Sequence, residues 1–207
     1  MTVVSNGTNL INNGTLDSAV PAGKMTLIKT LTASSSATLS FVDGASSVVL
    51  DDTYDSYVFK FISIHPSTNE RYLSFNMSTD SGSNYNVTKT TTFFRANHSE
   101  NNANADLAYR TGEDLAQSTN FQLISAQTGN GNDESLSGEL TLYNPSSTTF
   151  VKHFTAKSNA YQIGGATSNN SWIAGYGNTT SAVDAIRFQM DTGNMDSGII
   201  KMYGIGG

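Results

Sequence analysis

The stretch YVFKFISIHP, residues 57–66, alternates at period two and decides the fold class of this chain. In an extended strand, one side of this stretch would carry Tyr57, Phe59 and Phe61. The other side would carry Val58, Ile62 and Ile64. Apolar residues on both sides predict a central β-strand that is covered on both faces.

The same alternation recurs from about residue 24 onward. The further runs that predict strands are Lys24–Leu31, Ser36–Val42, Leu73–Met77, Phe121–Ile124, Leu136–Tyr143, Thr149–Thr155, Ala160–Gly164, Ser171–Tyr176, Ala185–Met190 and Gly198–Ile205. Turn formers such as Asp43-Gly44 and Asn144-Pro145 separate them. Helical periodicity is nearly absent, and 102–116 is expected to be a long loop with a short helix at most. The pattern predicts an all-β fold, a single antiparallel β-sandwich of jelly-roll type over residues 24–207.

The first 23 residues differ from the rest. They contain few strand formers and a near-repeat, Asn6-Gly7-Thr8 followed by Asn13-Gly14-Thr15. This segment is either a disordered tail or an extended N-terminal arm that becomes ordered against a neighbouring subunit. We favour the arm, because the scattered apolar side chains of this segment would bury little surface in an isolated tail. The residues expected to contact a partner are Leu10, Ile11, Leu16 and Val20.

Composition and charge exclude several classes of partner. Charged residues make up 14% of the 207 residues, and the formal net charge is -6. The 11 lysines and arginines are scattered singly, so neither a nucleic acid nor an anionic membrane is an expected partner. The chain has no cysteine, which rules out disulfides and leaves the redox compartment open. With no secretory signal and no long apolar run, it is expected to be made as a soluble cytosolic product.

No motif for catalysis is visible. The three histidines, His65, His98 and His153, lie in no nucleophile elbow and in no zinc-protease spacing. The acidic clusters are explained by the preference of aspartate for turns and helix caps, and they need no catalytic role. We therefore expect no enzymatic activity, no catalytic residues and no cofactor. No metal site is predicted, although the loops 51–53 and 191–194 offer oxygen ligands, and loop-bound calcium stays open.

Aromatic residues near loops are the remaining candidates for a binding site. Tyr85, Trp172 and Tyr176 could face a glycan, because amphipathic rings suit the faces of sugars. The alternative is that Trp172 and Tyr176, which share one side of a strand, pack in the core or at a subunit interface.

The C-terminal stretch 183–205 reads VDAIRFQMDTGNMDSGIIKMYGI. It resembles the ending "IxSIRF…SGNIxSGxIxLYGI" of small virion structural proteins of tailed, often marine, bacteriophages. Residues 57–85 are similar to the same group's pattern "Y-x-F…P…L-x-F-S-x-D-G-G-x-x-Y". Met202 stands where leucine is usual, and two glycines follow Ile205. We expect Ile186 to Ile205 to form a hairpin that fixes the C-terminus inside the sandwich.

The resemblance implies a structural protein of the virion, assembled in the host cytoplasm. The first hypothesis is a capsid decoration (cement) protein that binds the major capsid protein or other virion proteins and forms a homo-oligomer, often a trimer. The alternative is a receptor- or carbohydrate-binding module of a tail fibre or spike, or a minor tail component.

Overall fold

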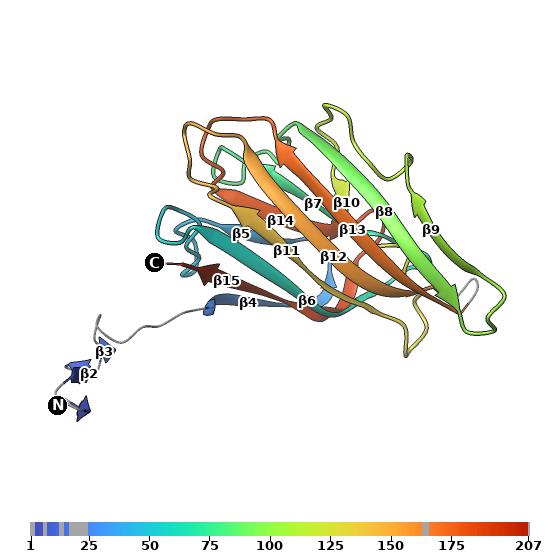
Figure 1. The fold of residues 1–207 in the computed structure, drawn as a ribbon, viewed down its shortest axis with the longest axis horizontal. Coiled ribbons are helices and arrows are strands. Elements are labelled where there is room, and N and C mark those ends of the chain that lie inside the picture. Colours follow the sequence, from blue (N-terminus) through green and yellow to red (C-terminus); the bar gives the residue numbers. More distant parts are fainter. Residues whose placement is uncertain (1–2, 6–7, 13–14, 17–24, 163–165, 207) are drawn as a thin grey trace.

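The computed structural model describes residues 3–5, 8–12, 15–16, 25–162 and 166–206. Every regular element in these ranges is a β-strand, and all strand pairs are antiparallel (Figure 1). The same ranges contain no helix that is long and apolar enough to cross a membrane. The predicted all-β antiparallel sandwich is confirmed.

The larger of the two main sheets has eight strands in the order β4-β15-β6-β11-β12-β13-β8-β9. Their bounds are β4 Met25–Ser36, β6 Ser56–Pro66, β8 Lys89–Ser99, β9 Ala105–Tyr109, β11 Leu136–Tyr143, β12 Lys152–Gln162, β13 Thr167–Gly177 and β15 Met195–Ile205. The smaller sheet has the order β10-β7-β14-β5. Its strands are β5 Leu39–Val42, β7 Leu73–Ser78, β10 Gln122–Leu123 and β14 Ala185–Met190.

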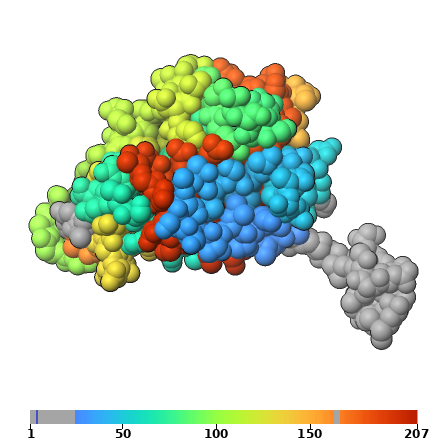
Figure 2. Space-filling model, turned by 180° about the vertical axis from the view of Figure 1, so that it is seen from behind, coloured from blue at the N-terminus to red at the C-terminus, as the bar shows by residue number. Residues whose placement is uncertain are grey.

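The connectivity of eight of these strands is that of a jelly roll. Taken in chain order they are β4, β5, β6, β7, β10, β11, β14 and β15. The first, eighth, third and sixth lie side by side in the large sheet, and the second, seventh, fourth and fifth form the small one. The remaining strands β12, β13, β8 and β9 extend the large sheet beyond β11. Figure 2 shows from behind how the early strands (blue) lie beside the C-terminal ones (red).

Residues 3–16 contain three short strands, β1 Val3–Ser5, β2 Thr8–Asn12 and β3 Thr15–Leu16, which pair with one another in a sheet of their own. Of the expected contact residues, Leu10 and Ile11 lie in β2 and Leu16 lies in β3. Val20 lies outside the described residues. The role of these residues stays a prediction.

Phe188 of β14 joins the two sheets at the centre of the core. Its ring lies 5.4 Å from Phe59 and 5.2 Å from Phe61, both of β6 in the large sheet. It also lies 6.3 Å from Phe41 and 6.4 Å from Phe75 in the small sheet. All five rings are buried. Tilted and edge-to-face ring pairs at these separations are favourable beyond the area that they bury.

The inner face of the added strands is more polar. Thr91 of β8 donates to Gln122 Oε1 at 2.6 Å, and Ser158 of β12 donates to the Ile124 carbonyl at 2.8 Å. Segment 113–128 thus covers this part of the large sheet through hydroxyl and amide groups. Because each buried polar group needs a partner, this segment is tied to the sheet by hydrogen bonds as well as by apolar contact.

Three details of the strand prediction are wrong. Strand β8 was not expected, because its inward residues Lys89, Thr91 and Ser99 are polar. The two runs expected at 149–155 and 160–164 share the single strand β12, in which buried residues, Lys152, Phe154, Ala156, Ser158 and Ala160, alternate with exposed polar ones; residues 163–164 of the second run lie outside the described residues. Segment 102–116 contains β9 and, in the described chain, no helix.

The C-terminal segment is not a hairpin. Strand β14 pairs with β5 and β7 in the small sheet, whereas β15 pairs with β4 and β6 in the large one. The turn at 191–194 therefore crosses between the sheets. The C-terminal strand is nevertheless an interior strand, paired on both edges.

A bulge corrects the predicted facing of β6. Ser63 has a φ of 49°, and the register shifts here against both neighbouring strands. Ile64 is consequently fully buried on the inner side, while Ile62 is 39% exposed on the outer side. Gly198 of β15 faces the bulge with a φ of +121°, where a Cβ atom would lie 2.7 Å from Ser63 O. Strand β6 is thus covered fully on its inner face only.

We expect Phe188→Ala to lower the free energy of unfolding by about 3–5 kcal/mol, because it leaves a cavity between the two sheets. Phe150→Ala is the matched control: Phe150 is 67% exposed, and its loss should change stability by less than about 0.5 kcal/mol. Urea unfolding of both variants measures the difference. Similar losses in the two variants would contradict the central position of Phe188.

Candidate functional site

The outer face of the large sheet carries most of the exposed apolar side chains. Ten large apolar residues of the described chain are exposed, and two of them, Val4 and Phe150, lie elsewhere. The other eight are Met25, Leu27, Ile62, Phe94, Leu107, Tyr109, Tyr143 and Trp172. Strand pairing and alternation place all eight on this one face. Such a concentration makes this face the candidate interaction surface.

A single line of side chains runs across this face, and we call it the cross-strand row. The pairing register aligns seven residues on seven adjacent strands: Lys201, Lys60, Glu139, Lys157, Trp172, Phe94 and Tyr109. Directly opposed residues of antiparallel strands share a face, so the row spans about 29 Å at the usual strand spacing. One part of the row is ionic and the other is aromatic.

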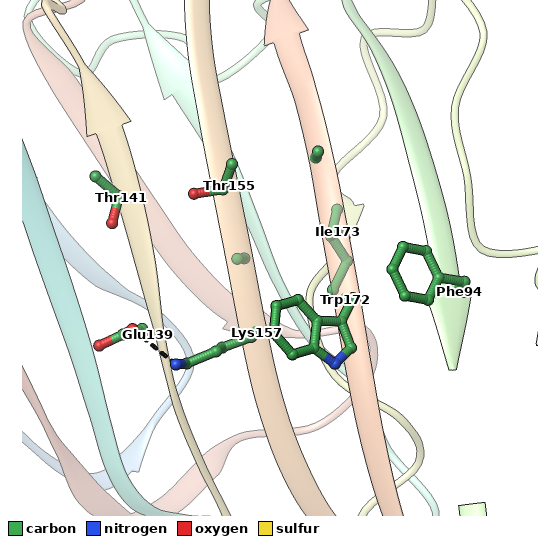
Figure 3. Close-up of a pocket in the computed structure, with 9 residues that line it drawn as sticks. Phe94, Glu139, Thr141, Thr155, Lys157, Trp172 and Ile173 are labelled. Carbon is green, nitrogen blue, oxygen red and sulfur yellow. Dashed lines mark ion pairs between the residues drawn. The ribbon is translucent and has the colours of Figure 1, made fainter. Parts of the chain in front are cut away.

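Trp172 and Phe94 form the aromatic part. Their ring centroids are 6.4 Å apart, and the planes differ by 1°. Figure 3 shows both rings face-on in a view onto the sheet, so they lie side by side and form a flat platform. With its amide oxygen turned toward the indole, Asn170 accepts from Trp172 Nε1 at 3.1 Å. The rings are 43% and 41% exposed, and they border a hollow of about 270 Å³.

Glu139 organises the ionic part. Its two carboxylate oxygens lie 3.3 Å from Lys60 Nζ and 3.4 Å from Lys157 Nζ. Burial alone would raise the pKa of Glu139, but the hydrogen bonds and charges of the two lysines outweigh it and lower that pKa. Lys157 Nζ also lies 6.0 Å from the centre of the Trp172 ring. Since Lys201 adds a further cation, the row carries three lysines and one carboxylate.

The structure separates the predicted glycan-facing residues. Trp172 and Tyr176 both project from β13 onto the outer face of the large sheet, where the Tyr176 ring packs 6.2 Å from that of His153. Tyr85 belongs to the other side of the sandwich. Its ring lies 3.9 Å from the Arg187 guanidinium, on the outer face of the small sheet. Tyr85 is therefore not part of the platform.

Sequence reasoning missed Phe94, Glu139 and Lys157. Phe94 lies in the unexpected strand β8, and the other two have no local pattern that marks them. Only the pairing of strands distant in the sequence brings them beside Trp172. The period-two alternation of residues 136–143 indicates on which face of the sheet Glu139 lies. It does not indicate which side chains lie next to Glu139.

The histidines each have a contact of their own. His65 Nδ1 lies 2.6 Å from the Glu134 carbonyl, and His98 Nε2 lies 3.0 Å from Asn102 Oδ1. In the described ranges, no three histidine or acidic side chains converge as metal ligands. Asp51 accepts from the backbone of Thr53 at 2.8 Å, and Asp191 lies 3.7 Å from Arg71 Nη1.

The outer face of the large sheet, in contrast, offers exposed apolar area and charged side chains that could bind a partner.

Comparisons with family models, curated proteins and solved structures give no match for this chain.

Lys89 is the most strongly perturbed basic group. Its side chain is fully buried, and Nζ donates to Asn76 Oδ1 at 2.6 Å and to the Val87 carbonyl at 2.7 Å. Burial lowers the pKa of Lys89 from 10.5 to about 7. Because both partners are neutral interior groups, Lys89 has the character of a structural residue.

The shift of Lys89 predicts how stability depends on pH. Below pH 7, Lys89 is protonated in both the folded and the unfolded chain and contributes no pH dependence. Between about pH 7 and 10.5, the unfolded chain binds this proton more strongly, so the free energy of unfolding rises with pH. The rise is at most about 1.4 kcal/mol per pH unit. Lys89→Met should remove it, as measured by urea unfolding between pH 7 and 9. The exposed-face variant Lys201→Met should keep it, and an unchanged slope in Lys89→Met would refute the assignment.

Proposed function

We propose that this protein is a structural component of a bacteriophage virion, a capsid decoration protein that acts by assembly. The observation that carries the proposal is the gathering of eight exposed apolar side chains on the outer face of the large sheet. A jelly-roll frame with a surface of low charge and the phage-like C-terminal motif support it.

The occupant of the outer face is a second copy of this chain, in a homo-oligomer such as a trimer. The cross-strand row is cationic, whereas the chain carries a formal charge of -6. The β5–β6 connection, residues 43–55, contains four aspartates and no lysine or arginine. This acidic loop of one copy complements the lysines of the row on another, which favours a specific register. The N-terminal residues Leu10, Ile11, Leu16 and Val20 would then be available to the major capsid protein.

The double variant Leu27→Asp, Tyr143→Asp tests the oligomer. Both side chains are exposed, so the fold should persist, but two buried carboxylates at the interface should dissociate the oligomer. Sedimentation velocity should show an assembled native protein and a monomeric variant. Phe150→Asp, which adds charge in the β11–β12 loop, should leave assembly intact. A monomeric native protein, or a variant that assembles normally, would count against the proposal.

A second candidate function, carbohydrate binding by a tail fibre or spike, is favoured by one observation. The parallel rings of Trp172 and Phe94, flanked by the Lys157–Glu139 ion pair, offer a flat apolar surface with hydrogen-bonding groups beside it. Rings of this kind can stack on sugar faces while the charged groups bind hydroxyls.

Trp172→Ala tests this second candidate. It should weaken binding of host-surface polysaccharide by about tenfold, as measured by titration calorimetry. Tyr85→Ala is the matched aromatic control, because Tyr85 lies on the other sheet. Equal affinity in all three proteins, or no saturable binding by the native chain, would remove the carbohydrate hypothesis.

A further inference from the structure

A pair of arginines lies where the edge strand β9 of the large sheet approaches the edge strand β10 of the small one. Arg95 of β8 is paired with Ala108 of β9, and the Arg110 amide donates to the Phe93 carbonyl at 2.8 Å. Arg95 and Arg110 are therefore diagonal neighbours on the inner face of the sheet. Arg110 also lines a hollow of about 420 Å³, together with Tyr72, Glu113 and Leu123.

Arg95 has no partner of its own in the described chain. No hydrogen bond or ion pair joins its guanidinium to a described residue, and its Nε is buried without an acceptor. Neither nearby carboxylate forms an ion pair with Arg95: Glu113 pairs with Arg110 at 3.4 Å, and Asp106 is exposed and lies beyond ion-pairing distance. Their charges act favourably on Arg95 from a distance, but without a direct partner its desolvation is compensated only in part.

The charges around Arg95 and Arg110 are compatible with a binding site for an anion. Burial and then the repulsion from Arg110 lower the pKa of Arg95, and the charges of Glu113 and Asp106 offset only part of this lowering. The Nε of Arg110 is also buried without an acceptor. An anion placed between the two guanidinium groups would reduce their mutual repulsion and would accept hydrogen bonds from both.

We propose that Arg110, together with its diagonal neighbour Arg95, binds the oxyanion group, a carboxylate or a sulfate, of a small ligand that occupies the hollow lined by Arg110. Tyr72 and Leu123 also line this hollow and would contact the uncharged part of the ligand. A volume of this size suits a ligand such as one acidic sugar. Arg95 and Arg110 lie on the inner face of the sheet and take no part in the proposed assembly surface, so either proposal can fail without the other, although Tyr109 borders both.

The test is a calorimetric titration of the full chain with galacturonate, with galactose and with sodium sulfate. Galacturonate should bind and galactose should not, because the two sugars differ in the carboxylate. Arg95→Met should weaken galacturonate binding by about tenfold or more, whereas Lys29→Met, which removes a positive charge on β4 at the opposite edge of the large sheet, should bind as the native protein does. Arg95→Lys, which keeps the charge but loses the planar fork, should be intermediate and provides a test if Arg95→Met fails to fold.

Competition by sulfate separates the two sources of the oxyanion. Displacement of galacturonate by sulfate supports a site that accepts either group, and failure to displace supports a carboxylate site. Equal binding of galactose and galacturonate, absence of binding by both galacturonate and sulfate, or full affinity in both Arg95 variants would overturn the proposal.

Discussion

The packing of Phe188 against phenylalanines from both sheets is the contact on which the sandwich depends. Strand β14, which carries Phe188, continues through the turn at 191–194 into β15 of the opposite sheet. The C-terminal segment therefore supplies an interior strand to each sheet and the ring that joins them. A chain without this segment would lose an interior strand of both sheets at once, which explains why its motif serves folding.

The large sheet is twice as wide as the small one, eight strands against four, and this mismatch shapes the molecule. Where the small sheet ends, segment 113–128 covers the inner face through polar side chains, and buried groups such as Lys89 must bond to neutral partners. The outer face has no such cover, and apolar side chains are exposed there. The added strands still contribute to the core, since Phe154 of β12 packs 4.9 Å from Phe75 of the small sheet and Phe93 of β8 is fully buried, but most of their other inward residues are polar.

Much of the frame could be predicted from period-two alternation, because β6, β7, β11 and β14 place large apolar residues toward one core. Strand β8 could not, since its inward Lys89 and Thr91 are satisfied by Asn76 and Gln122, which are distant in the sequence. The facing of Ile64 depended on a bulge at Ser63, where a non-glycine residue adopts a positive φ. For the site, Trp172 could be singled out as a scarce aromatic residue, but its neighbours Phe94 and Lys157 follow only from strand register.

In the function proposed above, the outer face of the large sheet becomes buried when the protein assembles. Trp172 is the only tryptophan of the chain and lies between Lys157 and Phe94 on that face, so its fluorescence reports on this burial directly. The decisive measurement is acrylamide quenching of the protein at increasing concentration and again when bound to virus particles. We expect quenching to fall and the emission to shift to shorter wavelength as assembly proceeds. A tryptophan that stays equally accessible in the assembled protein would contradict it.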